Sequence, residues 1–241
     1  MKKILAALLL TLPTMAVAVD LEGYYFTAKG GVSKTSDTGT TSLINVNGDL
    51  RSNQNEDLGT GSAFGFSVGK YLTNSFRLEL EAIKRTGYEF DARCTTICGT
   101  GVKDKAKIQT EALFINGFYD FQPFTMSNTA ITPYLGGGVG ISRNKMGTTE
   151  FYFNGLPGGV TIDGNTINQF AYKFSAGTLV SLTEQLSLDV NYQYVNLGAF
   201  KGGTEVYRDG LHTPASDVQK GINGGDIKSQ ELMFGLQYTF K

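Results

Sequence analysis

Large apolar residues occupy every second position near the carboxyl end of the chain. They are Leu232, Phe234, Leu236, Tyr238 and Phe240. This period of two is typical of a β-strand with one apolar face and one more polar face. Such a strand belongs either to a soluble sandwich, whose apolar face lies inside, or to a transmembrane barrel, whose apolar face meets lipid.

Similar patterning recurs along the chain and predicts eight strands. They cover residues 22–33, 61–72, 75–87, 106–120, 131–143, 169–182, 186–198 and 231–240. In residues 75–87, the clearest case, large apolar side chains alternate with charged ones. The segment 106–120 alternates poorly, so its faces are not assigned, and we consider a β-bulge as one cause.

The connections between these strands alternate strictly in length. Residues 73–74, 121–130 and 183–185 are short, whereas residues 34–60, 88–105, 144–168 and 199–227 are long. A soluble sandwich has no reason to place every long loop at one end, but an outer-membrane barrel does. We therefore predict an all-β fold, an eight-stranded antiparallel up-and-down transmembrane β-barrel. Its four long loops are extracellular and both termini are periplasmic.

The first 18 residues have the features of a secretory signal peptide. Lys2 and Lys3 precede an apolar run over residues 4–12, and Ala16 and Ala18 provide small residues for cleavage. The run is shorter than the roughly 20 residues that a spanning helix needs. We predict a signal peptide over 1–18 and one outer-membrane barrel domain over 19–241, in a Gram-negative cell.

Charge and composition argue against several functions. The formal net charge is −1, which does not favour nucleic acid as a partner. The glycine runs 136–138 and 158–159 lack the lysine and the helix of a phosphate-binding loop. We expect no cofactor.

The two cysteines, Cys94 and Cys98, lie close together in the chain. Outside the cytoplasm such a pair is expected to form a disulfide, which here would stabilise only the local loop shape. A metal site is a poorer alternative, because this pair supplies two ligands and the single histidine, His212, is remote in sequence. We therefore expect no bound metal.

Charged residues gather on the face of the strands opposite the apolar one. They are Lys29, Arg77, Glu79, Glu81, Lys173, Asp189 and Glu231. An eight-stranded barrel is narrow enough for side chains to fill it, and buried charges need partners. We predict that these residues form a charge network in a packed lumen without an open channel.

Two groups of residues suggest catalysis. Glu79 and Glu81 form a carboxylate pair suited to general acid–base chemistry, and His212 lies near Ser216 and Asp217. The carboxylates are better explained as partners of lumen cations, and histidines in polar loops are commonly just exposed. We predict that the protein is not an enzyme.

The third long loop holds the aromatic residues Phe151, Tyr152 and Phe153, which are candidate contacts for a binding partner. The alternative is that they pack among the loops or at the lipid boundary. The loop is expected to form a hairpin whose turn lies at 154–155 or at 157–159.

Three stretches carry a family resemblance: residues 116–121, residues 131–141 with the sequence ITPYLGGGVGI, and the alternating strand that ends at Phe240. The chain resembles the small eight-stranded outer-membrane barrels grouped with opacity proteins, OmpA-type transmembrane domains and surface antigens of intracellular bacteria. The resemblance implies assembly by the outer-membrane insertion machinery, with Phe240 as the assembly signal, although Lys241 follows it.

These features lead to one function and two alternatives. We predict an outer-membrane surface protein with a role in envelope structure, in which the lipid-embedded barrel presents its loops for adhesion to host or extracellular-matrix proteins, or for contact with the environment. A small-solute pore is the first alternative. A lipid-modifying or proteolytic enzyme at the barrel mouth is the second.

Overall fold

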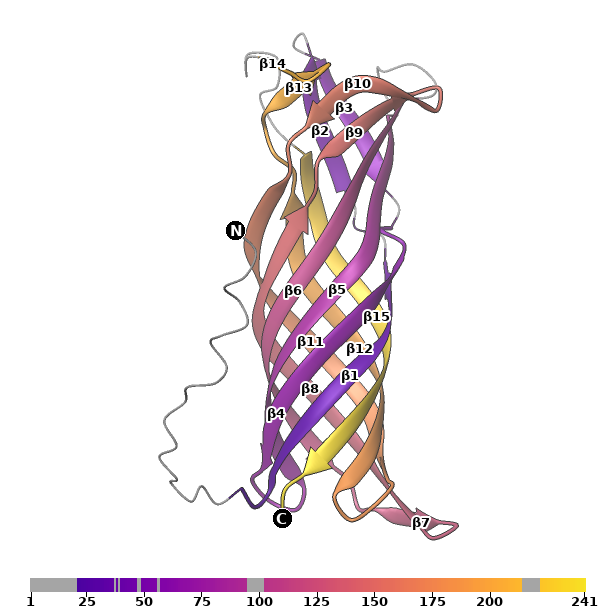
Figure 1. Ribbon diagram of the computed structural model, residues 1–241, viewed down its shortest axis with the longest axis vertical. Helices are drawn as coiled ribbons and strands as arrows, with labels where there is room; N and C mark the ends of the chain where they lie inside the picture. The colour runs from indigo at the N-terminus through magenta and orange to yellow at the C-terminus, as the bar shows by residue number, and fades with distance from the viewer. Residues whose placement is uncertain are drawn as a thin grey trace, which may run out of the picture.

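The computed structural model shows a tall barrel of antiparallel strands (Figure 1). It describes residues 21–36, 38, 40–46, 49–55, 57–94, 102–213 and 222–241. The barrel wall consists of β1 (Tyr24–Thr35), β4 (Thr60–Tyr71), β5 (Phe76–Cys94), β6 (Val102–Asp120), β8 (Thr129–Met146), β11 (Asn165–Ser181), β12 (Leu186–Lys201) and β15 (Ile222–Thr239). Within the described ranges, no helix has the length and apolar character needed to cross a membrane.

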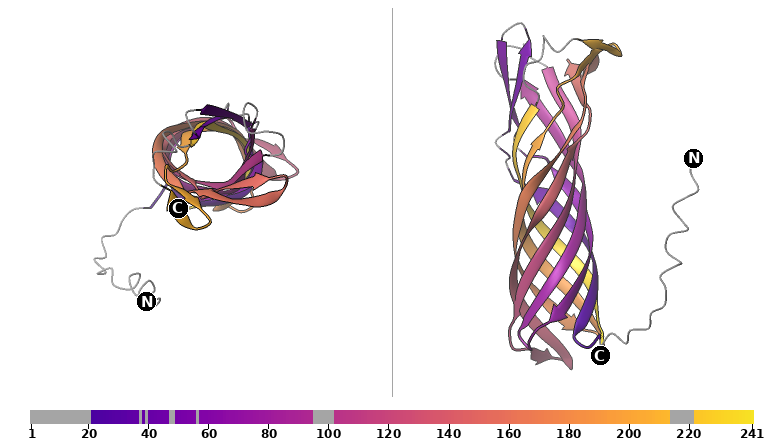
Figure 2. Two further views of the ribbon diagram at one scale, coloured as in Figure 1. Left: turned by 90° about the horizontal axis from the view of Figure 1, so that it is seen from above. Right: turned by 90° about the vertical axis from the view of Figure 1, so that its left-hand side faces the viewer.

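The eight wall strands close into a ring, as seen along the barrel in Figure 2. Each pairs antiparallel with the next, and β1 pairs with β15 from Tyr25 opposite Thr239 to Thr35 opposite Ser229. Closure leaves no free edge among these strands, which removes the usual site of edge-to-edge aggregation. The predicted fold class is confirmed.

Seven shorter strands lie in the connections, where only the hairpin of the third long loop was predicted. Six occur at one end of the barrel, here called the loop end: β2 (Thr40–Val46), β3 (Asp49–Asn55), β9 (Thr149–Phe153), β10 (Leu156–Ile162), β13 (Val206–Arg208) and β14 (Leu211–Thr213). The seventh, β7 (Phe124–Met126), pairs with the start of β8 at the opposite end, here called the turn end.

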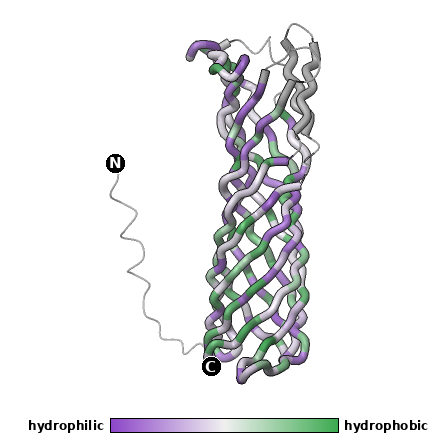
Figure 3. Tube along the Cα trace, turned by 90° about the vertical axis from the view of Figure 1, so that its right-hand side faces the viewer, coloured by the Kyte–Doolittle hydropathy of each residue, from purple (hydrophilic) through white to green (hydrophobic). Residues whose placement is uncertain are grey.

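A band of exposed apolar side chains covers the outside of the barrel toward the turn end. In Figure 3, hydrophobic residues are correspondingly frequent along the strands in that part of the barrel. The exposed members of the band include Phe64, Phe66, Leu80, Ile115, Val139, Phe170, Phe174, Phe234 and Leu236. Exposed apolar rows of this extent are costly in water and favourable against lipid, so the outer face of this half is the lipid face.

Toward the loop end the polarity of the two faces is reversed. The inside there is an apolar core in which the rings of Phe90 and Phe200 lie 6.0 Å apart, with Ile108, Met146 and Leu197 fully buried. β5 and β6 contain 19 residues each, whereas a strand needs about 9–11 to cross a membrane. The long strands therefore continue beyond the bilayer, where the barrel has the apolar inside of a soluble protein.

This reversal explains the poor alternation of residues 106–120. Even-numbered residues of β6 face inward from Asp104 to Asp120 without interruption. Inward residues are apolar near Ile108 but polar at Asn116. Outward residues change in the opposite sense, from charged at Lys107 to apolar at Ile115. The bulge that we considered for this segment lies instead in β5, where the register shifts between Arg85 and Tyr88. Gly87 supplies the required positive φ of 92°.

Candidate functional site

The turn-end half of the lumen holds all seven charged residues predicted to face inward, and each is at most 7% exposed. Lys29 Nζ lies 3.2 Å from Glu79 Oε1 and 3.1 Å from Glu81 Oε2. Lys173 Nζ also contacts Glu81. Asn116 Nδ2 donates to both carboxylates, at 3.1 and 2.9 Å. The two glutamates are thus matched by two lysines from β1 and β11.

Glycines on β8 make room for this cluster. Gly136, Gly138 and Gly140 face the lumen directly opposite Phe118, Asn116 and Phe114 of β6. A Cβ at Gly138 would overlap Asn116 Oδ1, and one at Gly140 would overlap the backbone oxygen of Leu113. The glycine run is therefore needed for the larger side chains of β6 to enter the lumen.

Three inward-facing charged residues, Arg85, Asp104 and Asp120, were missed by sequence reasoning. Arg85 Nε and Nη2 donate to Glu231 at 2.5 and 3.0 Å, and Arg77 Nε lies 3.1 Å from both oxygens of Asp120. Arg85 has the same strand parity as Arg77, which was an available signal. Asp120 had no such signal, because the faces of its strand were not assigned.

Asp189 has neutral partners. Tyr134 Oη donates to Asp189 Oδ1 at 2.6 Å, and Asn191 Nδ2 lies 3.4 Å from Oδ2. Tyr134 also makes a T-shaped contact with Phe118, with ring centres 5.4 Å apart. The Arg77 guanidinium lies 4.3 Å from the centre of the Phe118 ring. Charged and aromatic side chains therefore fill this part of the lumen together.

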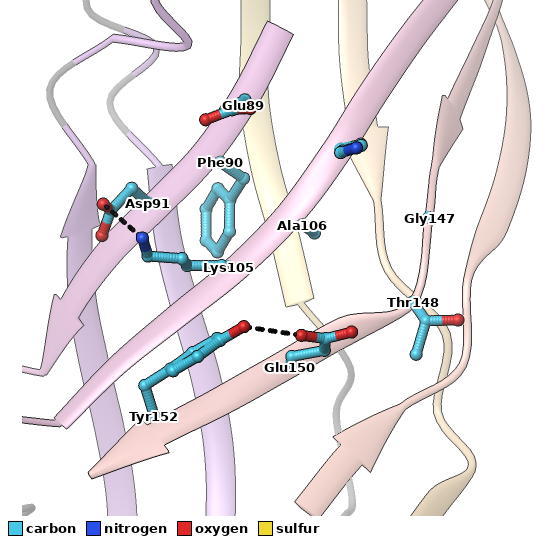
Figure 4. Close-up of a pocket in the computed structure, with 10 residues that line it drawn as sticks. Glu89, Phe90, Asp91, Lys105, Ala106, Gly147, Thr148, Glu150 and Tyr152 are labelled. Carbon is cyan, nitrogen blue, oxygen red and sulfur yellow. Dashed lines mark hydrogen bonds and ion pairs between the residues drawn. The ribbon is translucent and has the colours of Figure 1, made fainter. Parts of the chain in front are cut away.

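The loop end carries an open cleft on the outside of the barrel (Figure 4). It has a volume of about 500 Å³ and forms where the partner of β6 changes from β8 to β9. Gly147 N still donates to Lys107 O at 2.8 Å, and the next regular pair joins Lys105 and Glu150. The extra residues between these two pairs spread the strands apart.

Charged side chains and two aromatic rings, Phe90 and Tyr152, line this cleft. β5 contributes Glu89 and Asp91, β6 contributes Lys105 and Lys107, and β9 contributes Glu150 and Tyr152. Lys105 Nζ lies 3.8 Å from Asp91 Oδ2 and 5.6 Å from the centre of the Tyr152 ring. Tyr152 Oη donates to Glu150 Oε2 at 2.8 Å, and this bond to a carboxylate raises the pKa of Tyr152. The cleft therefore presents positive and negative side chains, hydrogen-bonding groups and the face of the Tyr152 ring to a binding partner.

The three aromatic residues of the third long loop have different surroundings. Phe151 is 6% exposed and packs in a small cluster with Val160, Ile162 and Val206. Tyr152 alone lines the cleft, while the side chain of Phe153 lies outside the described part of the structure. The hairpin turn is at Asn154–Gly155, which both have positive φ, and residues 157–161 contain a register shift.

Several predicted features concern residues outside those described. Cys94 ends β5, but Cys98 is not described, so the disulfide stays a prediction. His212 Nε2 lies 2.5 Å from Glu205 Oε2, whereas Ser216 and Asp217 are not described. Among the residues with described positions, no group of histidine, cysteine and carboxylate side chains is arranged to hold a metal ion.

The carboxyl end lies against the start of β1. Phe240 N donates to Tyr24 O at 2.9 Å, and the Phe240 ring lies 5.2 Å from that of Tyr238. Lys241 Nζ donates to Glu184 Oε2 at 2.7 Å. The terminal lysine thus contacts a neighbouring turn, while the aromatic residue remains at the rim of the barrel.

Comparisons with known proteins agree with this architecture. Residues 4–240 match the family described as "Outer membrane protein beta-barrel domain". Outer membrane protein PagN of Salmonella typhimurium is 27% identical over 239 residues, covering 93% of each chain. A protein of Rickettsia bellii named as a candidate adhesin is 26% identical, covering 71% of this chain and 72% of its own.

Solved structures also share the fold. Neisserial surface protein A has a TM-score of 0.53 at 16% identity, covering 91% of this chain and 98% of its own. The outer membrane protease OmpT of Escherichia coli has the same TM-score at 13% identity, covering 90% of this chain and 97% of its own. At these identities the likeness concerns the barrel fold alone.

Proposed function

The chain belongs to the outer membrane protein β-barrel family, and from this premise we propose that it is a surface protein whose barrel anchors adhesive loops. The observation that carries the proposal is the reversal of polarity along the barrel. An outward apolar band suits lipid at the turn end, and a polar exterior with an open cleft suits water at the loop end. A relative named as a candidate adhesin supports the same function.

The orientation follows from the proposed membrane position. Residues 1–18 would be removed as a signal peptide, and the insertion machinery would receive the barrel from the periplasm with Phe240 as its assembly signal. Because β1 and β15 both reach the turn end, that end would stay in the periplasm and the loop end would face outside. A mature protein that begins at Val19 and loops cut by external protease would support this arrangement.

We assign partner contact to the cleft around Tyr152. An accessible aromatic ring among charged groups is the composition that binding surfaces favour, and host or extracellular-matrix proteins are the proposed partners. Phe151 is excluded from direct contact in this proposal because it is buried in the loop cluster.

The test uses the full-length protein expressed on a non-adherent bacterium. Adhesion to cultured cells and binding to purified matrix and serum proteins are measured for the wild type, a deletion of residues 150–162, and Tyr152→Ala. Leu211→Ala is the control, because Leu211 is 75% exposed but does not line the cleft. At equal surface levels, we expect the deletion and Tyr152→Ala to lose adhesion and binding, and Leu211→Ala to retain both. Unchanged adhesion of both would remove the cleft from the proposed function.

The two alternative functions, a small-solute pore and an enzyme, are less favoured than a surface protein. The lumen is occupied by ion pairs in one half and by an apolar core in the other, which argues against steady solute flow. Glu79 and Glu81 are engaged by lysines and Asn116, which argues against general acid–base work by this pair. We propose that the protein has no enzymatic activity of its own.

A further inference from the structure

A row of charged side chains marks the upper limit of the apolar band on one side of the barrel. On the outward faces of β5, β6 and β8, apolar residues give way to Lys84, Glu111 and Arg143. The register places these three directly side by side, with Lys84 opposite Glu111 and Glu111 opposite Arg143. They therefore lie at the proposed boundary between lipid and water on three adjacent strands.

This row has more positive than negative charge. Lys84 Nζ lies 3.0 Å from Glu111 Oε1, and both side chains are half exposed. In the described part of the chain, no carboxylate lies within ion-pair distance of Arg143, Lys145 or Lys107, which follow on the outward faces of β8 and β6. Arg143 in the row, and Lys145 and Lys107 beyond it, therefore form no ion pair with a described carboxylate.

Apolar side chains adjoin two of the cations, Lys84 and Arg143, in a single groove. The groove has a volume of about 730 Å³, and Phe64, Phe66, Leu113 and Ile141 line it together with Lys84, Glu111 and Arg143. The four apolar residues are each more than half exposed. A ligand that fills this groove would combine acyl chains with an anionic headgroup.

The opposite side of the barrel differs at the corresponding strand positions. There, Val32 of β1 is followed outward by Lys34, and Leu232 of β15 is preceded on the same face by Gln230 and Lys228, so two cations stand where β5, β6 and β8 carry four. Gln230 Oε1 accepts a hydrogen bond from Tyr192 Oη at 2.8 Å. The concentration of cations on β5, β6 and β8 is therefore a local feature and not a uniform ring.

We propose that this groove binds lipid A, the phosphorylated glycolipid anchor of lipopolysaccharide, from the surrounding outer leaflet. Lys84 and Arg143 are two strand spacings apart, about 10 Å, and Lys145 lies about 7 Å further along β8. Cations spread over this range suit a headgroup with two separate phosphates better than a single phosphodiester. Arg143 suits one of them, because a guanidinium binds phosphate through two parallel hydrogen bonds. The inference rests on the proposed function, since it requires the loop end to face outside.

The experiment measures binding of diphosphoryl lipid A to the purified full-length protein, folded in neutral detergent micelles. The same lipid without phosphates and phosphatidylglycerol are the comparison ligands. Variants are Arg143→Gln with Lys145→Gln, Arg143→Lys, and Lys34→Gln as the matched cation on the opposite side. All of these side chains are exposed, so folding is expected to be retained, and the mobility shift of unboiled protein on a gel checks it.

We expect the double variant to lose roughly tenfold in affinity for diphosphoryl lipid A, Arg143→Lys to lose less, and Lys34→Gln to match the wild type. The lipid without phosphates should bind as weakly to the wild type as diphosphoryl lipid A binds to the double variant. Equal affinity of the double variant and the wild type, or equally tight binding of phosphatidylglycerol, would overturn the proposal. Because no loop contact is measured, a failure here is distinct from a failure of adhesion.

Discussion

Arg85 of β5 and Glu231 of β15 meet across the lumen through two hydrogen bonds, although β4 and β1 separate their strands in the wall. Glu231 also accepts hydrogen bonds from Ser33 at 2.7 Å and from Gln193 at 2.6 Å. Both charged side chains are fully buried. This pair therefore connects opposite parts of the wall where water cannot replace a lost partner.

Removing one member of this pair is expected to destabilise the barrel strongly. Arg85→Gln leaves the Glu231 carboxylate buried without its cation, a change that typically costs about 3–5 kcal/mol. Lys84→Gln is the matched control: its neighbouring ion pair with Glu111 is exposed, and such pairs contribute about 0–1 kcal/mol. Reversible urea unfolding in lipid vesicles measures both variants. Equal losses of unfolding free energy would show that the buried pair has no special role.

Glycines that face the lumen are expected to tolerate substitution less well than glycines that face outward. Gly140→Ala would push a methyl group against the backbone oxygen of Leu113 and the ring of Phe114, so we expect a loss of about 1–3 kcal/mol. Gly117→Ala on β6 is the control, because only Leu78 Cδ2, at 3.8 Å, lies near its added methyl group. Urea unfolding in vesicles again provides the measurement. A stable Gly140→Ala protein would mean that the strands shift more easily than this packing indicates.

The Tyr152–Glu150 bond predicts a pH dependence at the cleft. The tyrosine hydroxyl donates to a carboxylate, so ionisation of Tyr152 breaks the bond and brings two negative charges together. Since the pKa of Tyr152 is raised in the folded protein, the bond is fully present below the ordinary tyrosine pKa and is lost as pH rises through the raised one.

Replacement of Glu150 by glutamine should therefore lower the pKa of Tyr152 toward its ordinary value. Titration of ¹³C-labelled tyrosine by NMR measures this change, with Tyr152→Phe identifying the resonance. Glu89→Gln is the control, because Glu89 lines the same cleft, whereas the Tyr152 hydroxyl donates to Glu150. A Tyr152 pKa that does not respond to Glu150→Gln would contradict the hydrogen bond.

The filled lumen predicts no steady conductance in planar bilayers. A solute would have to pass the Lys29–Glu79–Glu81 cluster and then the apolar core around Phe90 and Phe200. A double variant with Phe90→Ala and Phe200→Ala should remain closed, because it opens only the second barrier. Regular open steps in the wild type would restore the pore hypothesis.

Much of the fold was predictable because lipid and the barrel lumen select opposite residue types along each strand. The predicted strand over residues 75–87 lies within β5 except for residue 75, and residues 231–240 form the carboxyl half of β15 with one residue beyond it. The faces of β6 were not predictable, because its strand passes from one environment to the other and local alternation changes sign at Glu111 to Leu113. Among the small strands of the loops, only the β9–β10 hairpin had a signal, its Asn154–Gly155 turn, since short polar hairpins have weak periodicity.

By itself, the sequence determined the barrel, its strand order and the charged character of its lumen, because these depend on residue spacing within single strands. Only the tertiary structure decided which charges meet. Arg85 reaches Glu231 across the lumen, Arg77 pairs with Asp120, and Arg143 remains beside a glutamate already engaged by Lys84. Such partners are set by register and closure, which bring together residues that are far apart in the chain and that no local pattern connects.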